Sequence, residues 1–221
     1  MTKEMGNSST YLPDSYPLRI GVATPELRVA DVDFNVAEIR KIARRAQRKK
    51  CRLVLFPELC LTGYTCADLF FQQHLQNKVE EALLELARLS AAEDMTLVVG
   101  APVSLSGRLF NCAVFISGGK ICGLVPKTFL PNSGEFYEQR WFCSAFECHS
   151  NTIQIGSQPV PFGTDLLFQA EDFASALIGI EICEDAWSVA PPSGSQALAG
   201  ATLLLNLSAS PEILGKHAYR R

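Results

Sequence analysis

Glu58, Lys127 and Cys183 each stand at the end of a short apolar run, where a buried strand would reach the surface of a sheet. A thiol is a poor nucleophile while protonated, and its ordinary pKa of about 8.5 leaves little thiolate at neutral pH. A carboxylate can remove that proton and later return it to a leaving amine. A fixed ammonium can stabilise a tetrahedral oxyanion. Together the three residue types predict hydrolysis of an amide through a thioester.

Each of these residues also has an ordinary structural explanation when it is considered alone. A glutamate after a strand is usually a solvated loop carboxylate, and a lysine after Val125-Pro126 is usually on the surface. A cysteine in an apolar strand is usually a small packing residue. The catalytic interpretation therefore depends on a fold that brings the three strand ends together.

The first part of the chain alternates between strands and helices. Apolar strands are expected at 18–23, 52–56 and 96–100, with an amphipathic helix capped by Asp33 and a second helix over 68–92 between them. The 52–56 segment is almost wholly apolar, which is typical of a strand buried on both faces. Residues 109–116 and 121–125 indicate a hairpin that leads to Lys127. This pattern predicts a layered α/β domain.

The second part of the chain carries Cys183. Turn residues are frequent over 132–173, and this segment is expected to form loops over the site. A strand over 175–183, a turn at 191–195, a short helix at 195–200 and a strand at 202–207 follow. Residues from Glu212 onwards resemble the opening of a helix that would extend past Arg221. We therefore expect a tail at 1–17 and one domain at 18–221 that is incomplete at its carboxyl end.

Charge and composition exclude several classes of function. Lys and Arg total 20 against 23 Asp and Glu, so no basic field is available for nucleic acid or an anionic membrane. The basic cluster at 44–50 is expected to be the last turns of a helix. The amino terminus lacks a signal-like apolar stretch and the apolar runs are strand-sized, which predicts a cytoplasmic protein.

The eight cysteines and three histidines do not form a recognisable metal motif. No Cys-x-x-Cys pair occurs and the histidines are scattered, so no metal site is predicted. Cys51, Cys112 and Cys122 lie in or beside strand-like segments and are expected to be small core residues.

The segments around the three reactive residues resemble the motifs of the nitrilase, or carbon-nitrogen hydrolase, superfamily. These segments are Phe56-Pro-Glu58-Leu, Pro126-Lys127-Thr-Phe-Leu-Pro131 and Gly179-Ile-Glu-Ile-Cys183-Glu-Asp185. The resemblance implies a four-layer α-β-β-α sandwich, with Glu58, Lys127 and Cys183 as a catalytic triad that needs no cofactor.

Four further segments are similar to the amino-terminal glutaminase domain of glutamine-dependent NAD synthetases. They are residues 59–70, 136–142, 183–187 and 206–210. This resemblance implies hydrolysis of glutamine to glutamate and ammonia. It also implies a homo-oligomer and a carboxyl-terminal synthetase domain, which would use the ammonia with ATP, Mg and deamido-NAD. The chain lacks that domain and alone is not predicted to make NAD.

The same resemblance assigns substrate-binding roles to four residues. Glu135 would be a fourth polar residue near the triad, holding either Lys127 or the substrate. Trp187 and Ser210 would line a glutamine pocket, and Lys216 would reach the substrate carboxylate. The alternatives are a loop carboxylate, a packed aromatic, a turn hydroxyl and a surface lysine.

One departure from the family pattern concerns the same pocket. Ser133-Gly134 stands where a tyrosine followed by arginine or glycine is common. Loss of the aromatic side chain would enlarge the pocket or weaken the contact with glutamine.

Two other functions remain open on the sequence. A stand-alone amidase or nitrilase of the same fold would act on another small amide, and a non-catalytic assembly module would keep the fold for oligomer contacts.

Overall fold

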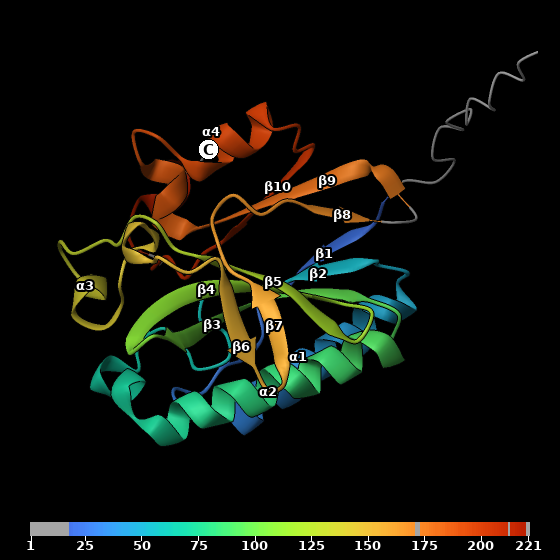
Figure 1. The fold of residues 1–221 in the computed structure, drawn as a ribbon, viewed down its shortest axis with the longest axis horizontal. Coiled ribbons are helices and arrows are strands. Elements are labelled where there is room, and N and C mark those ends of the chain that lie inside the picture. The colour runs from blue at the N-terminus through green and yellow to red at the C-terminus, as the bar shows by residue number, and fades with distance from the viewer. Residues whose placement is uncertain (1–17, 171–172, 212, 220–221) are drawn as a thin grey trace, which may run out of the picture.

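The computed structural model describes residues 18–170, 173–211 and 213–219, which form four layers (Figure 1). The first sheet has the order β1-β2-β3-β4-β5, in which β1, β2 and β3 are parallel and β3, β4 and β5 are antiparallel. The second sheet has the order β10-β9-β8, with β10 parallel and β8 antiparallel to β9. The strands of these two sheets are β1 (Ile20–Val22), β2 (Leu53–Leu55), β3 (Thr96–Leu105), β4 (Arg108–Ser117), β5 (Lys120–Pro126), β8 (Phe168–Ala170), β9 (Phe173–Ile182) and β10 (Leu203–Leu207).

Helices cover the outer faces of the two sheets. α1 (Val32–Arg48) and α2 (Gln73–Ala92) lie on the first sheet, and α4 (Pro192–Leu198) lies on the second (Figure 1). The described chain therefore has the four-layer α-β-β-α sandwich that the family resemblance implies. The remaining elements are the 3₁₀ helices Ala67–Phe71, Ala145–Glu147 and Cys183–Trp187, the helices α3 (Glu138–Trp141) and α5 (Lys216–Tyr219), and the hairpin of β6 (Thr152–Ile155) and β7 (Gln158–Pro161).

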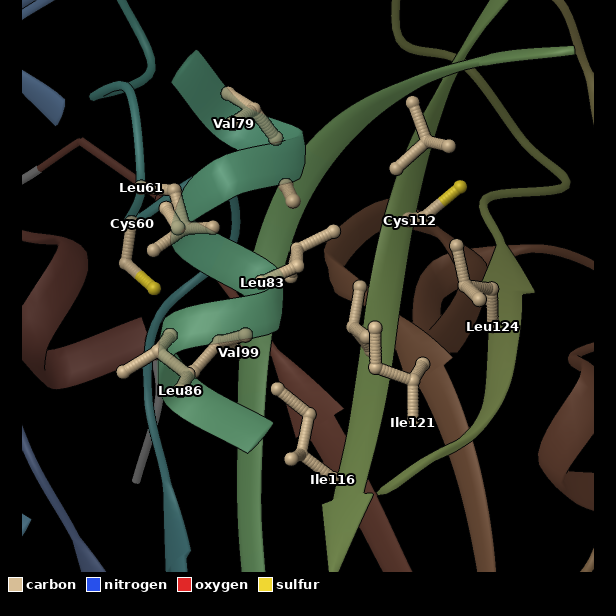
Figure 2. Close-up of a cluster of buried hydrophobic side chains, with 14 of the residues drawn as sticks. Cys60, Leu61, Val79, Leu83, Leu86, Val99, Cys112, Ile116, Ile121 and Leu124 are labelled. Atoms are coloured by element: carbon tan, nitrogen blue, oxygen red, sulfur yellow. The ribbon is translucent and has the colours of Figure 1, made fainter. Parts of the chain in front are cut away.

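Alternation along the central strands divides the core into two compartments. Successive side chains of a strand point to opposite faces, so Leu97 and Val99 of β3 pack toward the helices while Val98 packs between the sheets. In Figure 2 the α2 side chains Val79 and Leu83 lie in the helix-side compartment, over the first sheet. Both faces of the central strands are therefore buried, which explains why these strands are mostly apolar.

The predicted strands occur where the apolar runs placed them, but some boundaries and burial assignments were wrong. The α1 cap is Asp31, which accepts a hydrogen bond from the Phe34 N–H at 3.1 Å, whereas Asp33 pairs with Lys78 at the surface. The helix expected from 68 begins only at 73, because the extended backbone of Gln72 separates it from the 3₁₀ helix at 67–71.

Further differences concern the second half of the chain and the cysteines. Residues 192–195, expected as a turn, are the first turn of α4, where proline is well tolerated. Cys112 is buried as expected, but Cys51 and Cys122 are only half-buried. Glu212, where the helix was expected to begin, lies outside the described residues. The helix that the structure describes after it is α5 (Lys216–Tyr219). In the part of the chain that the structure describes, none of the helices combines the length and apolarity needed to cross a membrane.

Candidate active site

Glu58 and Lys127 follow two strands of the first sheet, β2 and β5, and form a buried ion pair. Lys127 Nζ lies 2.7 Å from Glu58 Oε1, and their side chains are fully buried. Glu58 follows β2 and Lys127 follows β5 directly. Buried charges are costly unless they are paired, so each of these two side chains offsets the cost of burying the other.

Glu138, at the start of α3, is the second carboxylate on Lys127. Its Oε1 lies 2.6 Å from Lys127 Nζ, and its side chain is only 1% exposed. The prediction that Glu135 could hold Lys127 is therefore corrected, since Glu135 is exposed and Glu138 occupies that place. The segment 136–142 had been singled out in the sequence, but spacing within a loop does not reveal which carboxylate turns inward.

Neutral donors also form hydrogen bonds with the two carboxylates. Asn111 Nδ2 of β4 donates to Glu58 Oε1 at 2.7 Å, and the Ala209 N–H donates to Glu58 Oε2 at 3.0 Å. The Tyr64 hydroxyl donates to Glu138 Oε1 at 2.7 Å. Glu58 thus accepts hydrogen bonds from three different segments, which fixes the direction of its carboxylate.

Cys183 occupies a strained turn at the end of β9. Its φ is +47°, in the left-handed region that non-glycine residues seldom adopt. Asn206 of β10 brackets its peptide group: the Cys183 N–H donates to Asn206 Oδ1 at 3.2 Å, and Asn206 Nδ2 donates to Cys183 O at 3.4 Å. Such strain persists only when neighbouring contacts hold it, and it is common at functional sites.

The segment after β10 brings the thiol and the base together. Ser208 Oγ donates to Cys183 Sγ at 3.3 Å, and the next residue, Ala209, donates its N–H to Glu58. Consecutive residues thus contact the Cys183 thiol and the Glu58 carboxylate. The structure therefore places Glu58, Lys127 and Cys183 in one cluster, as the family resemblance implies, although their catalytic roles remain a prediction.

Burial sets the charge states of this cluster. Burial, reinforced by the charge of Glu58, raises the pKa of the Cys183 thiol to about 11, whereas Lys127 and Ser208 lower it. Burial alone would lower the pKa of Lys127, but Glu58 and Glu138 raise it above its ordinary value. Burial raises the pKa of the Glu138 carboxyl, whereas Lys127 lowers it. At neutral pH the lysine is charged and the thiol keeps its proton, so a nucleophilic role of Cys183 would require a base.

Alkylation of Cys183 by iodoacetamide should therefore accelerate steeply with pH. Since the thiolate is the reactive form and the pKa is about 11, the rate should rise about tenfold per unit between pH 7 and pH 10. Peptide mass spectrometry can assign the rate to Cys183 rather than to the other cysteines. A rate that levels off below pH 9 would contradict the proposed environment of the thiol.

Gly100 of β3 allows the loop that carries Glu58 to approach the sheet. A Cβ atom on Gly100 would lie 2.6 Å from the Pro57 carbonyl oxygen, 2.7 Å from Glu58 C and closer still to Leu59 N. These are backbone atoms, which cannot move aside as the end of a flexible side chain can. Glycine is required here by close packing rather than by its φ angle.

Gly100→Ala is expected to lower the free energy of unfolding by about 1–3 kcal/mol, since the added methyl overpacks the core. It should also displace Glu58 and reduce any hydrolytic activity. Chemical denaturation measures the first effect. Gly194→Ala in α4 is the matched control, because no atom lies within 4 Å of a Cβ there and alanine favours a helix. Equal stabilities for the two variants would argue against the packing described.

The remaining predicted substrate-binding residues lie near the end of the described chain. Trp187 ends the 3₁₀ helix that Cys183 begins, and it is 62% exposed. Lys216 Nζ donates to Ser210 Oγ at 2.5 Å, so these two residues are in contact. Their roles toward a substrate stay predictions, and so does any direct role of Glu135.

A cavity of about 840 Å³ is lined by residues 128–131, 139, 142–144, 146–147, 184 and 188–190. Glu58, Lys127 and Cys183 are not among its lining residues. Among the described residues, no group of three His, Cys, Asp or Glu side chains is arranged to hold a metal ion.

Several polar residues of the site were not predicted from the sequence. Asn111 and Asn206 each interrupt an apolar strand, and a polar residue within such a run is a signal that could have identified them. Tyr64, Glu138 and Ser208 lie inside segments that were singled out only as wholes. Nothing in their spacing distinguishes them from their neighbours.

Comparison with known proteins shows the family of this chain. The profile of the carbon-nitrogen hydrolase family matches residues 19–218. The chain belongs to the carbon-nitrogen hydrolase family. It is 42% identical over 204 residues to the glutamine-dependent NAD(+) synthetase of Mycobacterium tuberculosis, an alignment that covers 92% of this chain and 30% of the relative.

Solved structures of a glutamine-dependent NAD(+) synthetase and of an amidase share the fold. The crystal structure of a glutamine-dependent NAD(+) synthetase from Cytophaga hutchinsonii superposes with a TM-score of 0.77 at 34% identity, covering 92% of this chain and 32% of that one. An amidase from Nesterenkonia sp. superposes with a TM-score of 0.72 at 19% identity, covering 95% of this chain and 72% of the amidase, a likeness of fold. The chain spans about a third of the length of the synthetases it matches.

Proposed function

We propose that this carbon-nitrogen hydrolase cleaves the side-chain amide of glutamine to give glutamate and ammonia. The observation that carries the proposal is the buried Glu58–Lys127 ion pair beside the strained turn of Cys183. The names of the relatives support glutamine as the amide. Glu58 would be the general base and acid, Lys127 the cation for the oxyanion, and Cys183 the nucleophile.

The first half-reaction releases ammonia. Glu58 accepts the thiol proton while Cys183 Sγ attacks the amide carbon, and the carbonyl oxygen becomes an oxyanion. Lys127 stabilises that charge with an ammonium held in place before the reaction begins, which avoids a reorganisation cost. Glu58 then gives its proton to the departing nitrogen, the carbon–nitrogen bond breaks, and ammonia leaves a thioester on Cys183.

The second half-reaction restores the thiol. Glu58, ionised again, accepts a proton from water, whose oxygen attacks the thioester carbonyl. Collapse of the second oxyanion breaks the carbon–sulfur bond, and Glu58 returns the proton to Cys183 Sγ as glutamate forms. One carboxylate thus serves both half-reactions, and its three hydrogen-bond donors keep it oriented throughout.

Glu138 makes the charge balance of this scheme possible. A lone Lys127–Glu58 pair would be neutral, and Lys127 could pass its proton to the carboxylate or to the thiolate. Glu138 and Glu58 together raise the pKa of Lys127, so it remains an ammonium while the thiol and Glu58 exchange a proton. The hydrolysis itself would need no cofactor.

The relatives support a wider context for the ammonia. In a full-length enzyme, a carboxyl-terminal synthetase domain would use it with ATP and Mg to amidate deamido-NAD. A homo-oligomer and a cytoplasmic location also remain predictions. Within the hydrolase, Trp187, Ser210 and Lys216 are proposed to contact glutamine, with Glu135 at the edge of the pocket.

The test combines turnover with covalent trapping. Ammonia release is measured with glutamine and with a simple aliphatic amide, and the protein is treated with a diazoketone analogue of glutamine before peptide mass spectrometry. Glutamine hydrolysis with labelling at Cys183 is expected, and Glu58→Gln should nearly abolish turnover. Preference for the simple amide would support a stand-alone amidase instead. A folded protein with neither turnover nor labelling would favour a non-catalytic module.

A further inference from the structure

Asp185 is a buried carboxylate that contacts the segments of both Lys127 and Cys183. Asp185 lies two positions after Cys183 and is only 1% exposed. Its Oδ1 accepts the N–H groups of Thr128 at 3.0 Å and Phe129 at 2.8 Å. Its Oδ2 accepts the Ile182 N–H at 3.0 Å.

These three donors are the neighbours of the two reactive residues. Thr128 and Phe129 directly follow Lys127, and Ile182 directly precedes Cys183. The strands that lead into them, β5 and β9, belong to different sheets, so no ladder of backbone hydrogen bonds sets their separation. The Asp185 carboxylate joins the two strand ends instead. Hydrogen bonds to an ionised acceptor are short and strong, and more so where water is excluded.

We propose that Asp185 is a positioning residue that sets the separation of the Lys127 ammonium and the Cys183 thiol. This inference rests on the proposed amide hydrolysis. Asp185 acts through the backbone of its neighbours rather than by touching the reacting atoms. A displacement of about 1 Å at a reacting group can cost about 10²-fold in rate, so such a carboxylate has a catalytic consequence.

The chemistry of the contact requires a carboxylate and not an amide. All three partners are N–H donors, and they use both oxygens of Asp185. An asparagine has nearly the same shape, but its NH₂ group would face at least one of these N–H donors. That hydrogen bond would be lost, because two donor groups would then face each other. Burial raises the pKa of Asp185 to about 6, against the lowering effect of the N–H donors, so the ionised form predominates at neutral pH.

Asp185→Asn is the first test, with Asp31→Asn as the matched control. Asp31 also accepts a backbone N–H, but it caps α1 at the surface, where asparagine caps equally well. For Asp185→Asn we expect kcat for glutamine hydrolysis to fall by about 10-fold or more with KM changed less than about twofold, since the displaced group acts in the transition state. The control should match the unaltered protein, and an unchanged kcat for Asp185→Asn would overturn the proposal.

A second measurement does not depend on glutamine hydrolysis. Lys127 lowers the pKa of the Cys183 thiol, so moving the ammonium away should raise that pKa and slow alkylation by iodoacetamide at pH 8. Simple removal of a negative charge near the thiol would have the opposite sign and accelerate alkylation. Slower labelling of Cys183 in the variant supports the positioning role, and equal or faster labelling overturns it. If the protein does not hydrolyse glutamine, this measurement still decides the role of Asp185.

Asp185→Glu provides the test if the asparagine variant does not fold. It keeps the charge but moves the carboxylate by one methylene in a buried turn. Slower alkylation of Cys183 and a reduced kcat are expected although the net charge is unchanged. Alkylation and kcat equal to those of the unaltered protein would contradict the proposed dependence on position.

Discussion

Cys183→Ala is expected to reduce glutamine hydrolysis by about 10⁴-fold or more, because no other group can form the thioester. Ser208 would lose the acceptor of its hydrogen bond, while Glu58 and Lys127 would stay paired, since their contact does not involve the thiol. The variant should still bind glutamine without turning it over. Ammonia release measures the loss, and calorimetric titration measures the retained binding.

Cys51→Ala is the control for that substitution. Cys51 is also half-buried, but it precedes β2 at the end of the strand opposite to Glu58. Its replacement should leave turnover unchanged within about twofold. Substantial turnover in Cys183→Ala, with intact turnover in Cys51→Ala, would show that hydrolysis does not pass through the thiol and would refute the proposed mechanism.

The positions of the three reactive residues could be predicted because buried strands are readable in the sequence. An apolar run that ends in a charged residue marks the place where a strand leaves the core, and Glu58, Lys127 and Cys183 all occur at such places. Their meeting point could not be obtained this way, because it depends on how the two sheets pack. The resemblance to the carbon-nitrogen hydrolases supplied that step.

The partners of the reactive residues were harder to predict for a different reason. Glu135 and Glu138 are carboxylates three positions apart in an irregular segment, where no periodicity distinguishes an inward from an outward side chain. The structure resolves the choice because only Glu138 begins the short helix α3 and turns toward Lys127. The inward position of the Asp185 side chain likewise depends on the single 3₁₀ helix Cys183–Trp187.

The reactive groups are held mainly by contacts between elements that are distant in the sequence. Asn111 of β4 orients Glu58, and Asn206 of β10 holds the strained peptide of Cys183. The N–H of Ala209, just beyond β10 of the second sheet, donates to Glu58, which follows β2 of the first sheet. A site built in this way depends on the packing of the sandwich, so substitutions that shift one sheet against the other should affect turnover before they unfold the protein.

Lys127→Met should lower kcat by about 10²-fold or more and remove much of the stability of the fold. Methionine fills a similar volume, but it leaves Glu58 and Glu138 buried without their shared cation. Removing one partner of a buried ion pair typically costs about 3–5 kcal/mol, and removing a donor to an oxyanion typically costs about 10²-fold or more in kcat. Urea denaturation and ammonia release measure the two losses.

The instability of Lys127→Met should depend on pH in a defined direction. Lys127 lowers the pKa of Glu138, so its removal raises the pKa of that carboxyl in the folded state further above the unfolded value. A group of this kind favours folding at low pH, and its contribution is lost as the pH rises through the folded pKa. The variant should therefore be closest to the unaltered protein near pH 5 and least stable, relative to it, near pH 8.

Two further variants separate the loss of the cation from other effects of the substitution. Lys120→Met makes the same change at the exposed beginning of β5 and should alter the free energy of unfolding by less than about 0.5 kcal/mol. Adding Glu138→Gln to Lys127→Met removes one of the stranded carboxylates, so the double variant should regain part of the stability at pH 8 and lose the part of the pH dependence that comes from Glu138. If instead Lys127→Met were equally destabilised at pH 5 and pH 8, and Glu138→Gln restored nothing, the buried charges would not be what the lysine stabilises.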